Sequence, residues 1–376
     1  MTWLHDPVAE LPAGAPELGL LTVLRADGSA DPSTDPAMPR ESLSRAYREM
    51  RRLRLLDVRM ILLQRQGRVG FYGACTGQEA VPIATGLVLG QGDWVFPALR
   101  EQSVMLVRGF PLRAFVAQVF GNSGDVQKGR QMPSHQSGRA VNQVSWSSCI
   151  GPQIPQAVGA AWAMKLAREK AVAVGFSGDG ATSQPDFHAA MTFAARYRVP
   201  AIILCQNNHW SISVPTSRQT AAPTIAVKGR AYGVPAVRVD GNDVLAMYRA
   251  VRDARARALA GEGPTFIEAV TYRIGAHSTS DDPTRYRSDA EVEAWKRKDP
   301  LDRLAKHMRH VGLLDDALDK ALEEELTAEI AAAVKEVEAL PAPDRASIFD
   351  DVYAELPWHL AAQREELMRA PAAPSH

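Results

Sequence analysis

An acid and an amide follow two apolar segments that have the composition of buried strands. Asp179 lies within Gly178-Asp179-Gly180 at the end of the run 171–178, and Asn208 follows the run 201–206. The carboxyl ends of parallel strands form the ligand-binding edge of an open sheet, so we expect the two side chains to be neighbours. With a nearby backbone carbonyl they would form an incomplete, oxygen-only shell. Such a shell suits Mg²⁺, which takes further ligands from phosphate and water.

The same segment predicts an anion site beside that shell. The glycines around Asp179 let the backbone approach a ligand closely, and their amides can face an anion. A helix predicted over 187–198 begins a few residues on, and its N-terminal dipole favours phosphate. Each motif alone is more often a turn or a strand-end cap. Their separation of about 29 residues, across a strand–helix–strand unit, favours a diphosphate held through a metal.

The elements that must position these residues alternate along the chain. Hydrophobic runs predict strands at 171–178, 201–206, 234–241 and 264–275, and helical spacing predicts helices over 187–198 and about 243–260. Strands alternating with helices in this way are typical of an α/β fold. We therefore expect a doubly wound, mostly parallel sheet with helices on both faces.

The two ends of the chain differ from this middle part. Residues 1–40 contain six prolines and three glycines, so we expect an extended or flexible arm without a packed element. Ser42 is the candidate N-cap of a helix over about 42–65. We expect an α/β domain at 41–340 and a C-terminal extension at 341–376. A helix predicted over 317–338, packing on its own domain or on a partner, has an apolar stripe formed by Leu318, Leu322, Leu326, Ile330, Val334 and Val337.

Composition excludes several classes of protein. The 376 residues include 43 basic and 43 acidic side chains, which gives no electrostatic case for binding nucleic acid or an anionic membrane. No run of 18 apolar residues and no secretory signal is seen. Cys75, Cys149 and Cys205 have no metal-binding spacing, and so small and odd a number suggests a reducing compartment. We therefore expect a cytoplasmic protein.

Further segments extend the pattern over most of the chain. They are GQEA (77–80), REQSVML (100–106), GNSGDVQKGRQMPSH (121–135), SSCIGPQIPQAVGAA (147–161), VDGNDV (239–244), TYRIGAHSTSDDPTRYRS (271–288) and FDDVYAELP (349–357). GDG followed after 25–30 residues by NN is the thiamine-diphosphate-binding motif. From about residue 42 to 365 the chain resembles the alpha subunits of the decarboxylating components of 2-oxo acid dehydrogenase complexes. QIPQAVGAA and YRIGAHSTSDDPTRYR are most similar to the branched-chain members; pyruvate-using members usually differ after the histidine and serine.

This resemblance implies a thiamine-diphosphate-binding fold and assigns site residues by position. Asp179, Asn208 and the backbone carbonyl of Trp210 would bind Mg²⁺. His277 would lie against the diphosphate and the reacting centre as the catalytic histidine. Ser278 corresponds to a regulatory phosphorylation site of animal relatives, in a loop, 278–288, that would order over the cofactor. The other cofactor contacts implied are Phe71, Leu99, Arg100, Ser148, Ile150, Gly178, Gly180, Ala181, Gln206 and Ile212.

Four positions depart from the pattern of the family. Leu99 replaces a tyrosine and removes one phosphate hydrogen bond, and Gln206 replaces a common arginine and removes a phosphate charge. Trp210 replaces a tyrosine, which is tolerable because only its carbonyl need bind metal. Pro152 stands where animal branched-chain members have a threonine that serves a potassium ion, so we do not expect that ion here. We interpret two further histidines, His135 and His188, as structural residues.

The resemblance also implies partners. The glutamate that activates thiamine diphosphate comes from a separate pyrimidine-binding domain, for which this chain has no counterpart. We therefore expect a beta subunit, in an assembly of two alpha and two beta chains with two-fold symmetry. The reaction implied is oxidative decarboxylation of a branched-chain 2-oxo acid, with transfer of the acyl group to the lipoyl group of an acyltransferase component. No nucleic acid or membrane partner is expected.

Three alternatives stay open. The nearest is the pyruvate or acetoin counterpart. A nicotinamide-dependent dehydrogenase is disfavoured because no G-x-G-x-x-G follows an early strand with an acidic residue about 20 residues on. A non-catalytic assembly subunit is compatible with Leu99 and Gln206, whereas Asp179, Asn208 and His277 argue against it.

Overall fold

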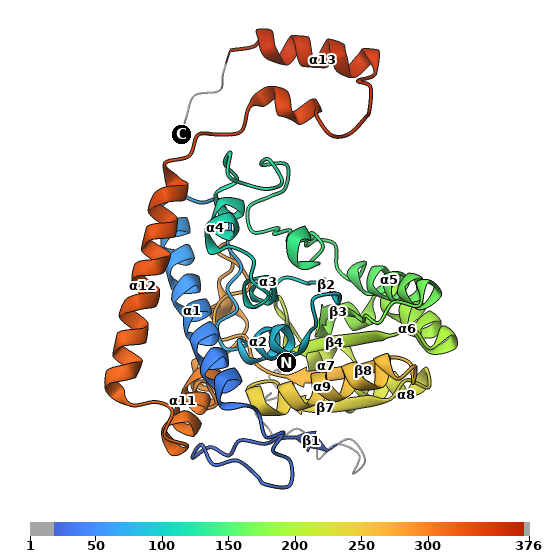
Figure 1. The fold of residues 1–376 in the computed structure, drawn as a ribbon, viewed down its shortest axis with the longest axis vertical. Coiled ribbons are helices and arrows are strands. Elements are labelled where there is room, and N and C mark those ends of the chain that lie inside the picture. The colour runs from blue at the N-terminus through green and yellow to red at the C-terminus, as the bar shows by residue number, and fades with distance from the viewer. Residues whose placement is uncertain (1–18, 372–376) are drawn as a thin grey trace.

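Parallel strands form the centre of the molecule (Figure 1). In the part of the chain that this computed structural model describes, residues 19–371, the strands are β1 (Leu20–Leu21), β2 (Trp94–Phe96), β3 (Ala173–Gly178), β4 (Ala201–Asn207), β5 (Trp210–Ser211), β6 (Val214–Pro215), β7 (Ala236–Asp240) and β8 (Thr265–Val270). Six of them form one all-parallel sheet in the order β1-β7-β8-β4-β3-β2. The other two, β5 and β6, form an antiparallel hairpin.

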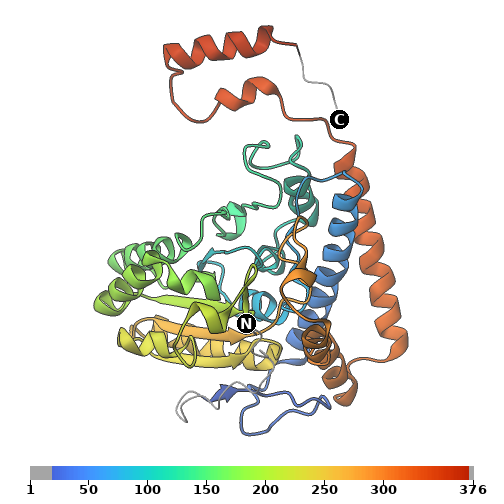
Figure 2. The same ribbon diagram turned by 180° about the vertical axis from the view of Figure 1, so that it is seen from behind.

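Helices cover both faces of this sheet, as Figures 1 and 2 show. The α-helices are α1 (Arg40–Arg65), α2 (Ala80–Val88), α3 (Ser103–Val107), α4 (Leu112–Phe120), α5 (Gln153–Ala167), α6 (Pro185–Tyr197), α7 (Thr216–Gln219), α8 (Val227–Ala231), α9 (Val244–Leu259), α10 (Asp289–Lys296), α11 (Pro300–His310), α12 (Asp316–Glu338) and α13 (Trp358–Arg369). Short 3₁₀ helices are η2 (Arg139–Val141), η3 (Asp179–Ser183), η4 (Pro283–Arg285) and η5 (Arg345–Phe349). The predicted α/β class is confirmed.

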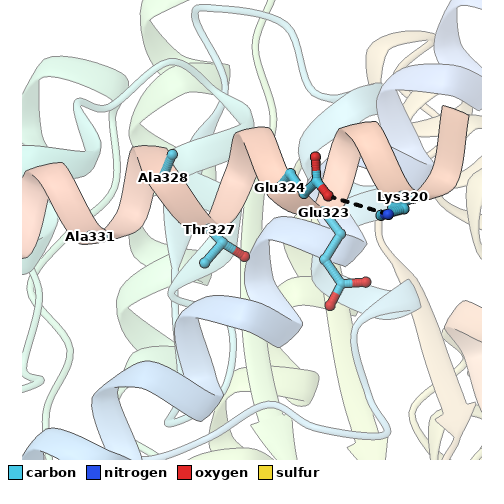
Figure 3. A pocket seen from close by; sticks show the side chains of 6 residues that line it. All are labelled: Lys320, Glu323, Glu324, Thr327, Ala328 and Ala331. Carbon is cyan, nitrogen blue, oxygen red and sulfur yellow. Dashed lines mark ion pairs between the residues drawn. The ribbon is translucent and has the colours of Figure 1, made fainter. Parts of the chain in front are cut away.

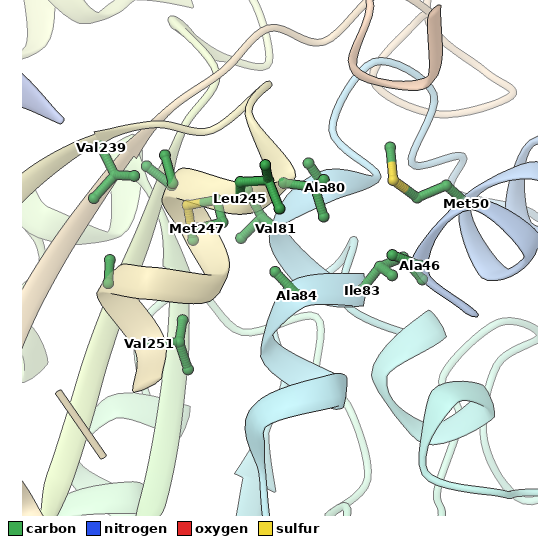
Figure 4. Close-up of a cluster of buried hydrophobic side chains, with 14 of the residues drawn as sticks. Ala46, Met50, Ala80, Val81, Ile83, Ala84, Val239, Leu245, Met247 and Val251 are labelled. Carbon is green, nitrogen blue, oxygen red and sulfur yellow. The ribbon is translucent and has the colours of Figure 1, made fainter. Parts of the chain in front are cut away.

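Alternate residues of each central strand enter two different cores, because successive side chains of a strand point to opposite faces. On β4, Ile202 and Leu204 join the core formed with α1, α2 and α9. Ile203 and Cys205 join the core formed with α5 and α6. Figure 4 shows part of the first core, where Val81 and Ala84 of α2 lie near side chains of α9. Burial on both faces explains why these strands read as continuous apolar runs.

The register of β3 and β4 fixes the position of the predicted chemistry. The two strands are parallel neighbours, and Gly178 at the end of β3 is paired with Gln206 near the end of β4. Asp179 and Asn208 follow these strands directly. The two residues therefore lie at the same carboxyl edge of the sheet, as predicted from the sequence.

The helix predicted over 317–338 is α12, and it packs on its own domain against α1 and α4. Leu326 within its apolar stripe and Val337 at the end of that stripe are completely buried, whereas Leu318 at its beginning is 56% exposed. The buried part of the stripe is thus shorter than predicted and begins after Leu318. Beyond α12, η5 and α13 lie apart from the sheet at one end of the molecule (Figures 1 and 2), and α13 contains no buried residue.

The N-terminal part of the chain corrects one prediction. Residues 1–18 lie outside the described residues, but the segment from residue 19 onward is not an unpacked arm, because β1 adds an edge strand to β7. The backbone amides of Val23 and Leu24 donate to the Asp243 carboxylate at 2.7 and 2.6 Å. This buried acceptor fixes a segment whose composition indicates no element.

Two boundaries also differ from the prediction. Helix α1 begins at Arg40 after Pro39, so Ser42 lies in its first turn and is not the N-cap. Strand β8 ends at Val270 instead of continuing to 275. Beyond it, the carbonyls of 273–275 accept hydrogen bonds from the Arg287 guanidinium instead of a neighbouring strand.

Two further expectations can be compared with the described residues. All three cysteines are free thiols. None of the helices in residues 19–371 is long and apolar enough to cross a membrane.

Candidate active site

Asp179 begins η3 at the end of β3 and is 2% exposed. Its Oδ2 accepts hydrogen bonds from the hydroxyls of Ser211 at 3.0 Å and Thr216 at 3.1 Å. Burial raises the pKa of this carboxyl, and the two hydroxyl hydrogen bonds partly oppose that rise. The Thr216 hydroxyl also lies 3.2 Å from Oδ1 of Asn207, so it links the ends of β3 and β4.

Asn208 and Trp210 supply two further oxygens at this edge. Asn208 is 8% exposed, and its Nδ2 donates to Gln78 Oε1 at 3.0 Å. Its Oδ1 accepts from the backbone amide of Trp210 at 3.2 Å. The Trp210 indole is held by Glu291, to which its Nε1 donates at 2.8 Å, so the side chain points into the protein and leaves only the backbone for a ligand.

Two buried arginines lie at the same edge without a counter-ion. Arg100 is 5% exposed and donates to the carbonyls of Ala74 and His277, the latter at 2.7 Å. Arg273 is 1% exposed and donates to the carbonyls of Trp210 and Ile212. Among the described residues, neither arginine forms an ion pair. Burial and repulsion by Arg273 lower the pKa of Arg100 to about 10, and burial lowers that of Arg273.

His277 lies between these arginines. Arg273 Nη1, which can only donate, lies 3.3 Å from His277 Nδ1, so the neutral ring carries its proton on Nε2. Burial, followed by the charges of Arg100 and Arg273, lowers the pKa of His277 to about 4. The backbone amide of His277 donates to Asp281 at 2.7 Å. The imidazole is therefore held neutral at pH 7, with a donor on Nε2.

At Gly180 the glycine-containing turn packs closely against Ser211, and at Gly178 it borders open space. A Cβ at Gly180 would lie 2.4 Å from Ser211 Oγ, the hydroxyl that binds Asp179. A Cβ at Gly178 would meet nothing within 4 Å, so the space beside this backbone is open. Ala181 is buried at 3% exposure with its side chain in the core, so only its backbone could face a ligand.

Two predicted residues, Ser148 and Phe71, contact His135, and a third, Ile150, is mostly exposed. Ser148 is exposed and its hydroxyl pairs with His135 Nε2, while the Phe71 ring lies 6.4 Å from the His135 ring. Ile150 is 61% exposed. The structural interpretation of His135 fits this packing, with Trp146 only 3.7 Å away between ring centroids. The hydrogen-bond partners of the Asp179 carboxylate are Ser211 and Thr216, and none of these residues is among them.

The remaining predicted residues have more local roles. Leu99 is half-buried and packs on Gly73, where a Cβ would lie 2.9 Å from Leu99 Cδ1. Gln206 is buried and donates to Glu101. Burial raises the pKa of Glu101 to about 7, although the Gln206 hydrogen bond opposes the rise. Gln206 thus pairs with a buried acid.

Three further residues differ in their surroundings. Ile212 is 53% exposed and adopts φ +56°, a conformation that a β-branched residue rarely takes, and Arg273 binds its carbonyl. Ser278 is half-buried in the loop that follows His277. His188 is exposed and pairs with the Tyr232 hydroxyl, away from the strand ends.

Sequence reasoning missed Arg273 and Gln78. Both lie in segments that had been noted as motifs, but neither was given a role. Gln78 lies two residues before α2, and Arg273 lies three residues after β8, in a segment that the sequence places within the predicted strand 264–275. Their importance comes from contacts across the sheet edge, which a linear pattern does not contain.

The residues fit a divalent cation and a diphosphate on two structural grounds. The candidate metal ligands at the strand ends are a carboxylate, an amide oxygen and a backbone carbonyl. This is the set of hard oxygen ligands that Mg²⁺ prefers. Buried arginines are normally paired, so Arg100 and Arg273 without a carboxylate indicate a missing anion. Asp179, Asn208 and Trp210 would hold the cation, and the two arginines would face the diphosphate.

A hollow on the surface of the molecule lacks the buried polar side chains found at the strand ends. It lies on the outer side of α12 and is lined by Lys320, Glu323, Glu324, Thr327, Ala328 and Ala331 (Figure 3). Lys320 and Glu324 pair with each other at 3.9 Å. No buried polar residue lines it, so the strand ends are the candidate site.

Comparison with known proteins identifies the family of the chain. The family described as "Dehydrogenase E1 component" matches residues 47–345. The bovine mitochondrial 2-oxoisovalerate dehydrogenase subunit alpha is 43% identical over 340 residues, which cover 90% of this chain and 75% of the relative. The 2-oxoisovalerate dehydrogenase subunit alpha of Pseudomonas aeruginosa is 41% identical over 372 residues, covering 96% of this chain and 90% of the relative. The chain therefore belongs to the dehydrogenase E1 component family.

Proposed function

We propose that this chain is the alpha subunit of a branched-chain 2-oxo acid dehydrogenase, with 3-methyl-2-oxobutanoate dehydrogenase activity. The relatives named 2-oxoisovalerate dehydrogenase subunit alpha support the substrate class. The family is thiamine-diphosphate-dependent, and we propose that Mg²⁺ accompanies the cofactor here. The observation that carries this proposal is the meeting of an oxygen-only cation shell with two buried arginines that lack counter-ions.

Each residue of the site would have a distinct task. Asp179, Asn208 and the Trp210 carbonyl hold the cation, and the amides of Gly180 and Ala181 face the diphosphate. Arg100 and Arg273 neutralise it, in a buried place where charge–charge attraction is strong. When bound, thiamine diphosphate supplies the electron sink that makes decarboxylation possible.

His277 would act at the reacting centre. Its Nε2–H can donate a hydrogen bond to the substrate, because Nδ1 is occupied by Arg273. Its lowered pKa keeps the ring neutral, so it does not add a third positive charge beside Arg100. Phe71, Ser148 and Ile150 are proposed to line the aminopyrimidine side of the cofactor. Ser148 and Phe71 contact His135, outside the proposed cation shell.

The proposed assembly contains two further kinds of chain. As an alpha subunit it would pair with a beta subunit that provides the activating glutamate, in an assembly of two alpha and two beta chains. A lipoyl-bearing acyltransferase component would receive the acyl group. The loop that follows His277 would order over the cofactor, and Ser278 within it is a candidate site of regulatory phosphorylation. A phosphate there would add about two negative charges beside the diphosphate.

The test uses the co-expressed alpha and beta chains. Calorimetric titration with thiamine diphosphate and Mg²⁺ should show binding, and Asp179→Asn should weaken it by more than about 100-fold, because even partners outside the metal shell cost 10–100-fold. Asp253→Asn, at an exposed acid of α9, is the matched control and should bind normally. The complex should decarboxylate 3-methyl-2-oxobutanoate in preference to pyruvate. Absence of cofactor binding by the unsubstituted complex, or a strong pyruvate preference, would overturn the proposal.

A further inference from the structure

Gln78 lies next to Asn208, one of the candidate metal ligands. It precedes α2 and is completely buried, and its Oε1 accepts a hydrogen bond from Asn208 Nδ2 at 3.0 Å. This is a contact between side chains 130 positions apart in the sequence. Gln78 therefore contacts a proposed cation ligand from outside the cation shell.

The hydrogen-bond partners fix the orientation of both amides. The backbone N–H of Trp210 can only donate, and it donates to Asn208 Oδ1 at 3.2 Å. Asn208 must then direct its NH₂ group toward Gln78. Because that group is a donor, Gln78 must present its oxygen, which leaves Gln78 Nε2 buried without an acceptor among the described residues.

The backbone around Gln78 is itself held in place. The amide of Gly77 donates to Glu79 Oε2 at 2.9 Å, and the carbonyl of Gly77 accepts from the Thr271 hydroxyl at 3.2 Å. Gly77 has φ +91°, and a Cβ there would lie 2.4 Å from Cγ1 of Ile274. Only glycine allows this close approach, so the segment that carries Gln78 is locked against the chain beyond β8.

Its orientation has a chemical consequence for Asn208. The two ends of an asparagine amide are almost equal in shape, but one end is an acceptor and the other a donor. If the amide turned over, its NH₂ group would face the cation and could not ligate it. The Trp210 N–H alone favours the correct orientation, and the Gln78 oxygen adds a second contact that only this orientation satisfies.

We propose that Gln78 is a positioning residue of the metal site, which holds the Asn208 amide with its oxygen available to the cation. This inference rests on the proposed function. A buried donor without a partner costs free energy, and its presence here is understandable if the glutamine is required for its oxygen.

Metal affinity provides the test. The co-expressed alpha and beta chains, saturated with thiamine diphosphate, are titrated with Mg²⁺ by calorimetry, and with Mn²⁺ by electron paramagnetic resonance. Gln78→Met keeps the length but removes the acceptor and should weaken metal binding by about 10- to 100-fold, the range for partners of metal ligands. Gln78→Glu keeps an acceptor oxygen and should stay within about threefold of the original chain.

A matched control separates positioning from general damage. Gln102 is also buried, and its Nε2 donates to the Gly73 carbonyl at 2.9 Å in the same loop, but it does not contact Asn208. Gln102→Met should leave the metal affinity within about threefold of the original. Unchanged affinity in Gln78→Met, or an equal loss in Gln78→Glu, would overturn the inference.

A double-mutant cycle covers the case in which Gln78→Met does not fold. Asn208→Asp removes the donor, so combining it with Gln78→Glu would place two acceptors face to face, and the combined loss in metal affinity should exceed the product of the single losses. Losses that simply multiply would mean that the two side chains are not coupled and would reject the inference. If the unsubstituted complex itself fails to bind metal, it is the proposed function that fails.

Discussion

Arginines have opposite surroundings in two regions of the molecule. Along the contact of α1 with α12, Arg48 pairs with Glu325 at 2.8 Å, and Arg51 pairs with Glu323. These side chains are partly exposed, and each of these two arginines has an anion from the same chain. At the strand ends, Arg100 and Arg273 are buried and are surrounded by carbonyl oxygens.

The comparison shows which charges belong to the fold and which await a ligand. Exposed ion pairs contribute little, about 0–1 kcal/mol each, because water screens them. A buried cation without a counter-ion is costly, and it is tolerated where binding offsets the cost. Arg48 and Arg51 at the helix contact are therefore neutralised by acids of the chain itself. Arg100 and Arg273 at the strand ends have no such acid among the described residues.

The largest effect should come from removing a charge at the strand ends. Arg100→Gln should weaken thiamine diphosphate binding by roughly 10- to 100-fold, since hydrogen bonds to charged groups contribute about 1.5–3 kcal/mol. The free energy of unfolding of the cofactor-free complex should change less. The substitution removes hydrogen bonds of Arg100, but it also removes the repulsion between the buried charges of Arg100 and Arg273. Calorimetric titration and thermal unfolding measure the two quantities. Unchanged cofactor affinity would contradict the contrast between the regions.

An intermediate effect is expected on the pKa of His277 when the charges around it change. Its pKa of about 4 lies below the ordinary 6.5, so its contribution to stability is complete above pH 6.5 and is lost as the pH falls from 6.5 through 4, where the unfolded chain binds a proton that the folded chain does not. A diphosphate between Arg100 and Arg273 would offset their charges and raise this pKa. Arg100→Gln alone should raise it too. The NMR chemical shift of the His277 ring, measured against pH with and without cofactor and in Arg100→Gln, tests both expectations. A pKa that changes in neither case would contradict an anion site beside these arginines.

The smallest effect should come from the helix contact. Arg51→Gln should lower the free energy of unfolding by about 0.2–1 kcal/mol, as for other exposed pairs, and should leave cofactor affinity unchanged. Glu323→Gln should have a similar effect, because Arg51 and Glu323 belong to one ion pair. Denaturant unfolding measures the change. A loss of cofactor affinity in Arg51→Gln would show that the two regions are not independent.

Much of the fold was predictable because it depends on local patterns. The runs that form β3 and β4 are apolar and end in polar residues, so the shared edge of Asp179 and Asn208 follows from parallel pairing alone. Helices α6, α9 and α12 were found within three residues of their ends. The family resemblance supplied names for residues and did not supply their contacts.

The rest depends on contacts between distant segments. β1 has only two residues, and its order comes from pairing with β7 more than 200 positions away, together with Asp243. The sequence places Arg273 in the strand predicted at 264–275, and only the folded chain shows it beyond β8 and buried without an ion pair among the described residues. The Glu101–Gln206 pair likewise joins residues more than 100 positions apart, so the sequence could not show that Gln206 faces an acid.

The short strand β1 has one more consequence. A terminal strand of a sheet leaves a row of backbone groups free, and such a row can template pairing with another chain. β1 occupies that position along β7, and its own length of two residues offers little for a foreign strand to extend. Because Asp243 secures the segment from the start of α9, the helix that packs on β7 also holds in place the short strand that covers the edge of β7.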